Sequence, residues 1–224
     1  DVAGATGSQN AMRGVGTLLQ NRYFIYAASL PARYSGINPE VTTMTTALYT
    51  HASSAEHDTG PGHPESIARI EAVNEALSGA SWNKLKRTEA PLATKEQLRR
   101  VHAGGYVDLV LDNIPEDGYA RLDADTVLSP GSGEAALRAA GAIIAAVDDV
   151  VAGNVDNAFC AVRPPGHHAV PERGMGFCLF NNVAIGAMHA RAAHGLKKIA
   201  IVDFDVHHGN GTQAMFEADA DTLF

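Results

Sequence analysis

The sequence predicts an α/β fold in which helices cover both faces of a parallel β-sheet. Two uninterrupted apolar runs, residues 158–162 and 199–202, are typical of strands that are buried on both faces. Helical patterns lie before and between these runs, over residues 132–152 and 183–194. Strands and helices that alternate in this way form parallel sheets.

The elements before residue 90 follow from local signals. Residues 47–49 form a short apolar run that fits a strand. Pro64 suits a first helical position, where a missing N–H needs no partner, and Glu65 suits the first turn. One face of this helix is apolar, and Gly79 is expected to end it. The residues of that face are Ile67, Ile70, Val73 and Leu77.

Three further signals complete the predicted fold. Thr94 and Gln97 have the spacing of a capping box at the start of a helix. Residues 213–217 are helical in pattern, and residues 221–224 look like the beginning of another strand. We therefore expect a sheet that is truncated at the C-terminus, with an edge left uncovered.

Residues 1–43 differ from the rest of the chain, and we expect them to be a poorly ordered N-terminal extension. They are rich in small residues, show no sustained periodicity and contain only Asp1 and Glu40 as acids. Because the segment also contains arginines, organellar import is an alternative interpretation. The folded domain is expected to span residues 44–224.

Composition narrows the classes of partner. The formal net charge is −8, and no run of lysine and arginine is long enough to follow a phosphate backbone, so direct nucleic-acid binding is not expected. An acidic surface suits a cationic substrate, although it also serves solubility alone. Cys160 and Cys178 are too few for a disulfide scaffold, which favours a reducing compartment and a cytoplasmic location. No stretch approaches the roughly 20 apolar residues that cross a bilayer, so no membrane partner is expected.

The first polar cluster is the segment RPPGHH, residues 163–168, which directly follows a predicted strand. Two prolines and a glycine continue neither a ladder nor a helix, so a rigid loop is expected. This loop presents His167 and His168 side by side. Histidine titrates near neutrality, which suits proton transfer. The alternative is a loop with two solvated histidines.

The second cluster, DFDVHHGNG at residues 203–211, lies at the exit of the next predicted strand. Side chains alternate in an extended chain, so Asp203, Asp205 and His207 are expected to point the same way. Such a group is costly to desolvate without a cation or hydrogen-bond donors. Carboxylate and imidazole together suit Zn²⁺, whereas Ca²⁺ and Mg²⁺ prefer oxygen ligands. The alternative is an acidic strand end that is satisfied by hydrogen bonds.

Between the two clusters lies GMGFCLFNN, residues 174–182. Its glycines allow the backbone to approach a ligand closely, and Phe177 offers an apolar wall. Cys178 is expected to be a buried structural thiol and not a nucleophile.

Together these segments resemble the histone deacetylase family, in particular its class II and bacterial amidohydrolase-like branch. The resemblance covers residues 44–224 and implies an arginase/deacetylase-like fold. The match rests on RPPGHH (163–168), GFCLFNN (176–182) and VDFDVHHGNGTQ (202–213), with GPGHPES (60–66) and VHAGGYV (101–107) in the N-terminal part of the domain.

The resemblance implies a metal centre beside a pair of catalytic histidines. Asp205 and His207 become ligands of a Zn²⁺ cofactor, and a structural K⁺ is expected near Asp203, Asp205 and the His207 carbonyl. His167 and His168 become the tandem catalytic histidines. Asp203 would orient the first of them and Asn210 would partner the second.

Gly176 and Phe177 would line a narrow tunnel for the stem of an acylated amine. The implied activity is hydrolysis of N-acetyl amides by metal-activated water, with the tandem histidines as base. Acetyl-lysine in histones or other proteins is the expected substrate. Acetylpolyamines or small molecules are alternatives, as is a non-catalytic fragment that binds acyl-lysine.

Two further implications concern what the sequence lacks. The family's third zinc ligand, an aspartate, and its oxyanion-stabilising tyrosine would fall beyond residue 224, so the chain alone is expected to bind zinc poorly and to have little activity. An arginase-type dimanganese enzyme is disfavoured, because residues 205–209 lack the closing acid of the pattern Asp-x-His-x-Asp.

Overall fold

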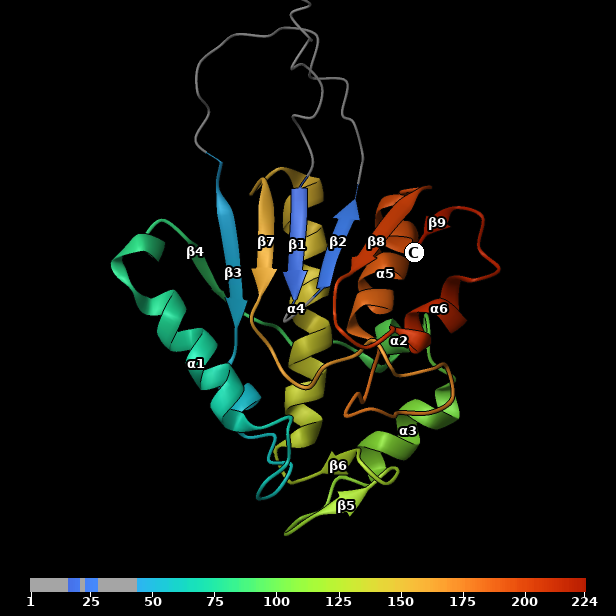
Figure 1. The fold of residues 1–224 in the computed structure, drawn as a ribbon. Coiled ribbons are helices and arrows are strands. Elements are labelled where there is room, and N and C mark those ends of the chain that lie inside the picture. Colours follow the sequence, from blue (N-terminus) through green and yellow to red (C-terminus); the bar gives the residue numbers. More distant parts are fainter. Residues whose placement is uncertain (1–15, 21–22, 28–43) are drawn as a thin grey trace, which may run out of the picture.

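The computed structural model describes residues 16–20, 23–27 and 44–224 (Figure 1). In this part of the chain one sheet has the strand order β4-β3-β7-β1-β2-β8-β9, and a small second sheet pairs β5 with β6. The strands are β1 (Gly16–Gln20), β2 (Tyr23–Ala27), β3 (Thr46–Thr50), β4 (Lys86–Glu89), β5 (Ala120–Arg121), β6 (Val127–Leu128), β7 (Asn157–Cys160), β8 (Ile199–Asp203) and β9 (Thr222–Leu223).

Helices cover both faces of the large sheet, as predicted. The helices are α1 (Ile67–Ser78), α2 (Lys95–Leu98), α3 (Gly104–Asp112), α4 (Ser132–Ala152), α5 (Asn182–His194) and α6 (Asn210–Phe216), with short 3-10 turns η1 (Ala52–Ala55) and η2 (Ala80–Trp82). Successive side chains of β3 point to opposite faces. Ala47 and Tyr49 pack into the core built by α4 and α5, whereas Leu48 packs against Ile70 of α1.

The helix ends largely follow the sequence signals. Thr94 and Gln97 form the predicted capping box. Helices α4 and α5 end at Gly153 and Gly195, whose φ angles of 74° and 68° lie in the left-handed region that glycine adopts without strain. The prediction for α1 was wrong at its start. This helix begins at Ile67 and not at Pro64, because the intervening loop is held by a buried ion pair that is described below.

Strands β1 and β2 lie in the segment that the sequence assigns to an extension. β1 pairs parallel with β7 and antiparallel with β2, and β2 pairs antiparallel with β8, so the hairpin fills the space between β7 and β8. The sequence analysis did not expect strands here, because sheet pairing of such short segments is decided by the open edges of their neighbours and not by local pattern. The domain boundary at residue 44 and the poorly ordered character of the extension stay predictions.

The topology brings the two polar clusters to one edge of the sheet. Strands β3 and β7 are parallel, and the pairings through β1 and β2 orient β8 in the same direction. The loops that follow β7 and β8 therefore leave from the same edge, the lower edge in Figure 1. Ligands of open α/β sheets collect at this carboxyl edge. In the described part of the chain, no helix has the length and apolar character needed to cross a membrane.

Candidate active site

The loop after β7 is fixed by an ion pair that the sequence analysis did not assign. Arg163 is 1% exposed and donates from Nε and Nη2 to the two carboxylate oxygens of Glu65, both at 2.6 Å. Its Nη1 donates to the Ser54 carbonyl, also at 2.6 Å. Glu65 is 1% exposed as well. A bidentate pair of this kind sets position and orientation together, so the loop at 163–168 is tied to the segment ahead of α1.

The loop places the two predicted histidines in contact. The ring centroids of His167 and His168 are 3.8 Å apart, with the planes tilted by 45°. His167 Nδ1 lies 2.8 Å from Asp203 Oδ2, and His168 Nδ1 lies 2.6 Å from Asn210 Oδ1. Both pairings are those that the resemblance implies. They join the loop after β7 to the segment after β8.

The environment of His168 favours its neutral form. Burial lowers the pKa of His168, the hydrogen bond that His168 donates to Asn210 opposes this, and the neighbouring His167 and His207 lower it further. The Asn210 amide nitrogen donates to Met175 Sδ at 3.6 Å, which directs its oxygen toward His168. Nδ1 of His168 therefore carries the proton, and the lone pair of the neutral ring is on Nε2.

The segment after β8 orders its polar side chains by local hydrogen bonds. The backbone N–H of Asp205 donates to Asp203 Oδ1 at 3.1 Å, and that of His207 donates to Asp205 Oδ1 at 2.9 Å. His207 Nδ1 lies 3.2 Å from the same oxygen. The Asp203 and Asp205 side chains are each 6% exposed, whereas that of His207 is 70% exposed. The Asp205 side chain thus contacts His207, which lies at the rim, and the Asp205 backbone contacts Asp203. That all three side chains point the same way stays a prediction.

The donor set at Asp205 and His207 fits a zinc ion in chemistry. A buried carboxylate and an imidazole nitrogen lie within 3.2 Å of each other, which is close to the separation of two ligands on one Zn²⁺. A desolvated carboxylate at this position also calls for a cation or for donors. The expectation that these residues supply two zinc ligands, and the expectation of K⁺, stay predictions.

The glycine-rich segment lies directly against His168. A Cβ atom on Gly176 would meet His168 Cδ2 at 2.5 Å, so only glycine fits there. The Phe177 ring packs edge-on against His63, with centroids 4.7 Å apart. Cys178 is fully buried, and burial raises the pKa of its thiol, which agrees with the structural role expected for it.

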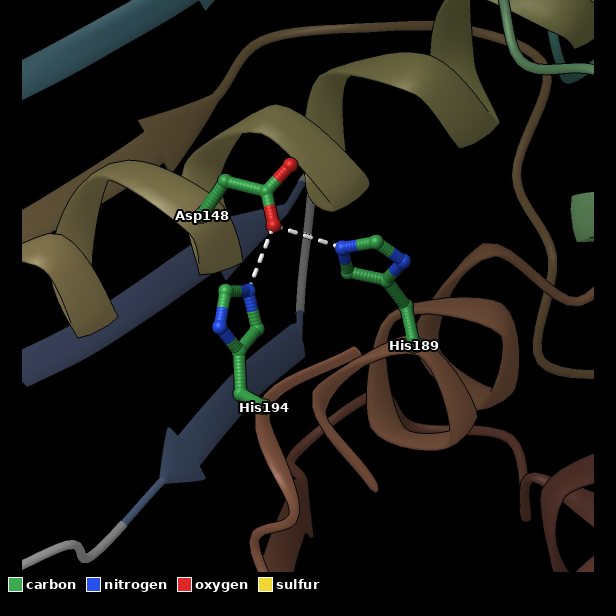
Figure 2. Close-up of side chains that lie close together, drawn as sticks. All are labelled: Asp148, His189 and His194. Atoms are coloured by element: carbon green, nitrogen blue, oxygen red, sulfur yellow. Dashed lines mark hydrogen bonds and ion pairs between the residues drawn. The ribbon is translucent and has the colours of Figure 1, made fainter. Parts of the chain in front are cut away.

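A further cluster of polar side chains, outside the two predicted clusters, was missed by sequence reasoning. Asp148 of α4 accepts hydrogen bonds at 2.6 Å from Nε2 of both His189 and His194 of α5 (Figure 2). In the described residues this is the only group of three His, Cys, Asp or Glu side chains whose ligand atoms all lie within 4.8 Å of one another. Asp148 and the two histidines are remote in sequence, so no local pattern indicates their meeting.

The partner on the other side of His189 decides what this cluster does. Arg100 Nη1 lies 2.5 Å from His189 Nδ1. Arginine only donates, so Nδ1 must accept and the ring proton is on Nε2, facing Asp148. A metal ion would need the lone pair of Nε2, which is absent in this tautomer. The cluster is therefore a hydrogen-bonded link from Arg100 through His189 to Asp148.

Comparison with known proteins decides the family. The model of the histone deacetylase domain matches residues 63–224, which is more than half of the chain. The chain belongs to the histone deacetylase family. The paired histidines and the segment after β8 both lie within the matched region.

Relatives in the histone deacetylase family come from bacteria, plants and animals. The chain is 42% identical over 160 residues to a histone deacetylase-like amidohydrolase of Pseudomonas aeruginosa, covering 71% of the chain and 41% of that protein. It is 38% identical over 194 residues to histone deacetylase 14, chloroplastic, of Arabidopsis thaliana, covering 79% of the chain and 46% of that protein. It is 40% identical over 167 residues to the human polyamine deacetylase HDAC10, covering 70% of the chain and 25% of that protein.

A solved structure of the same family confirms the fold. The crystal structure of the HDA15 HD domain superimposes with a TM-score of 0.77 at 38% identity, covering 81% of this chain and 53% of that one. The predicted fold class, an arginase/deacetylase-like α/β fold, is thereby confirmed. The chain spans less than half the length of the first two relatives above.

Proposed function

We propose that the protein is a zinc-dependent deacetylase that hydrolyses N-acetyl amides, with acetyl-lysine in histones or other proteins as substrate. The observation that carries this proposal is the His168–Asn210 pair. It leaves the lone pair of a neutral imidazole on Nε2, beside a second imidazole and a carboxylate–imidazole donor set. A neutral imidazole whose Nε2 carries a lone pair can take a proton from water during attack on an amide carbonyl.

Asp205 and His207 would hold the zinc ion in this proposal. Zn²⁺ supplies Lewis-acid polarisation of the acyl carbonyl and acidifies water at neutral pH. His168 accepts the proton of the attacking water and returns it to the leaving amine. Asp203 holds His167 through the 2.8 Å contact, so the ring adjacent to His168 stays in one orientation.

Gly176 and Phe177 would form one wall of the channel that receives the substrate stem. Gly176 lets the backbone pass close to His168, and the Phe177 ring gives an apolar surface beside His63. An unbranched aliphatic stem would bury its methylene groups against such a surface, at about 0.8 kcal/mol per group.

An acetylpolyamine is the second candidate substrate. It is supported by the similarity to a protein named polyamine deacetylase, and by the net charge of −8, which favours a polycationic ligand. A non-catalytic protein that binds acyl-lysine is the third reading.

The deciding experiment is a substrate panel on the full-length protein, with and without a chelator. Turnover of acetyl-lysine peptides that is lost with the chelator and restored by Zn²⁺ supports the main proposal. Preference for acetylpolyamines selects the second candidate. Binding of acetyl-lysine peptides without acetate release selects the third.

Location is a separate proposal. We infer a cytoplasmic protein from the cysteine content, with import through residues 1–43 as the alternative. The alternative is supported by similarity to two proteins whose names include the word chloroplastic. Subcellular fractionation of the full-length protein distinguishes the two.

A further inference from the structure

The backbone of Phe177 adopts a conformation that phenylalanine rarely takes. Its φ is 70°, and among the described residues it is the only residue other than glycine with a positive φ. Gly176 before it has a φ of 56°. Such a conformation is strained for a residue with a Cβ atom, so surrounding contacts must hold it in place.

The strained residue sits in a tight turn. The backbone N–H of Met175 donates to the Cys178 carbonyl at 3.2 Å, and that of Cys178 donates to the Met175 carbonyl at 2.9 Å. Gly176 and Phe177 are the two central residues, and both have positive φ, as in a type I′ turn. The second central position of such turns is usually glycine. An aromatic ring there is thus kept at a cost to stability.

One side chain outside the turn holds Phe177. The backbone N–H of Phe177 donates to Thr126 Oγ1 at 3.2 Å. Thr126 is fully buried and donates its own hydroxyl proton to Asp125 Oδ1 at 3.2 Å, which leaves the oxygen to act as acceptor. The Thr126 backbone is fixed in turn, because its N–H donates to Asp123 Oδ1 at 2.8 Å.

The Phe177 ring is held from a second direction. His63 packs edge-on against it, and His63 Nε2 lies 3.2 Å from the Asp125 carbonyl. The loop between β5 and β6 therefore contacts both the backbone and, through His63, the ring of Phe177. Phe177 stands one residue from the glycine that packs on His168, so a shift of the turn moves the wall relative to the proposed base.

We propose that Thr126 is a positioning residue for substrate: its hydroxyl holds Phe177 in the left-handed conformation and so sets the width of the channel beside His168. This inference rests on the proposed function, since it assigns the wall of the proposed channel. Thr126 does not touch the reacting atoms. Its effect is on the binding of the substrate stem and not on proton transfer.

The test compares Thr126→Val with Thr126→Ser in the full-length protein. Valine keeps the shape of threonine and removes the hydroxyl, whereas serine keeps the hydroxyl. A neutral hydrogen bond contributes about 0.5–1.5 kcal/mol, so we expect roughly a 2- to 13-fold rise in KM for acetyl-lysine peptides in the valine variant. The pH profile should be unchanged, and serine should restore KM.

A second measurement makes the outcome independent of activity. Hydrogen exchange of the Phe177 amide should be faster in Thr126→Val than in Thr126→Ser or the parent protein. Unchanged exchange in the valine variant, or equal rises in KM for both variants, overturns the inference. If the parent protein hydrolyses no acetylated substrate, the proposed function fails, and the exchange measurement still decides the role of Thr126.

Discussion

His168 Nδ1 lies 2.6 Å from Asn210 Oδ1, so the partner of the proposed catalytic base is a neutral amide. An amide oxygen stabilises the imidazolium form less than a carboxylate does. Burial therefore keeps the pKa of His168 below its ordinary value, and the hydrogen bond to Asn210 opposes this only in part. The buried site favours a base that is already deprotonated at neutral pH, which the weak stabilisation by a neutral amide does not reverse.

We expect Asn210→Asp to raise the pKa of His168. A carboxylate at this distance stabilises the charged ring more than an amide oxygen does. Because the base must be deprotonated, the acidic limb of the profile of kcat/KM against pH should move to higher pH. Asn210→Ala, which offers no acceptor, should move it the other way. If the acidic limbs of Asn210→Asp and the parent protein coincide, the role of His168 as base is contradicted.

The Arg163–Glu65 pair should dominate the stability of the site loop. Glu65→Gln leaves a buried guanidinium without its counter-charge, which costs about 3–5 kcal/mol in the free energy of unfolding. Glu134→Gln is the control, since Glu134 pairs with Arg138 at the surface and its loss should cost less than ~1 kcal/mol. Urea denaturation of both variants measures the difference. Equal losses of stability in the two variants would show that the buried pair contributes no more than the surface pair.

Gly176→Ala separates steric clash from backbone strain. Alanine at this position meets His168 at 2.5 Å and also adopts a φ of 56°. Gly118→Ala is the matched control, because Gly118 has a φ of 67° and no atom within 4 Å of the added Cβ. Both should lose about 1 kcal/mol of stability to strain. We expect only Gly176→Ala to abolish deacetylation. Full activity in that variant would show that the turn can move away from His168.

His102 should make the protein sensitive to acid. Burial lowers its pKa from 6.5 to about 4, against hydrogen bonds with the Pro171 and Val170 carbonyls. Between these values the unfolded chain takes up a proton that the folded protein does not, so stability falls as the pH drops from 6.5 toward 4. The loss approaches about 3 kcal/mol and levels off below pH 4.

Denaturation across this pH range measures the effect. Glutamine in His102→Gln offers a donor and an acceptor but does not titrate. The free energy of unfolding of this variant should therefore change less steeply with pH, by a slope that corresponds to about one proton taken up on unfolding. An identical pH dependence in both proteins would mean that His102 is not the group responsible.

Arg100 should keep metal ions out of the cluster of Asp148, His189 and His194. In the protein with Arg100 in place, Zn²⁺ titration by calorimetry should give the same stoichiometry with and without His194→Ala. Removing the donor in Arg100→Leu frees His189 to change tautomer, so a new zinc site that depends on His194 should appear. A fall in stoichiometry in His194→Ala alone would show that the cluster binds metal already.

The sequence by itself determined the fold class and most element positions, and it supplied the candidate residues of the site. Apolar runs, the Thr94–Gln97 capping box and glycines at helix ends are local signals, since each depends on residues a few positions apart. The adjacent His167 and His168 are visible for the same reason, and family motifs supplied their partners Asp203 and Asn210.

Only the tertiary structure decided the contacts between residues that are distant in the chain. The pairing of Arg163 with Glu65, which moved the start of α1, spans 98 positions. The contact of Arg100 with His189 and that of Thr126 with Phe177 span 89 and 51. A buried charge or a strained backbone is compatible with many partners in sequence. Which partner satisfies it depends on the sheet that brings the loops to one edge, because hydrogen bonds act over about 3 Å and carry no mark in the local pattern.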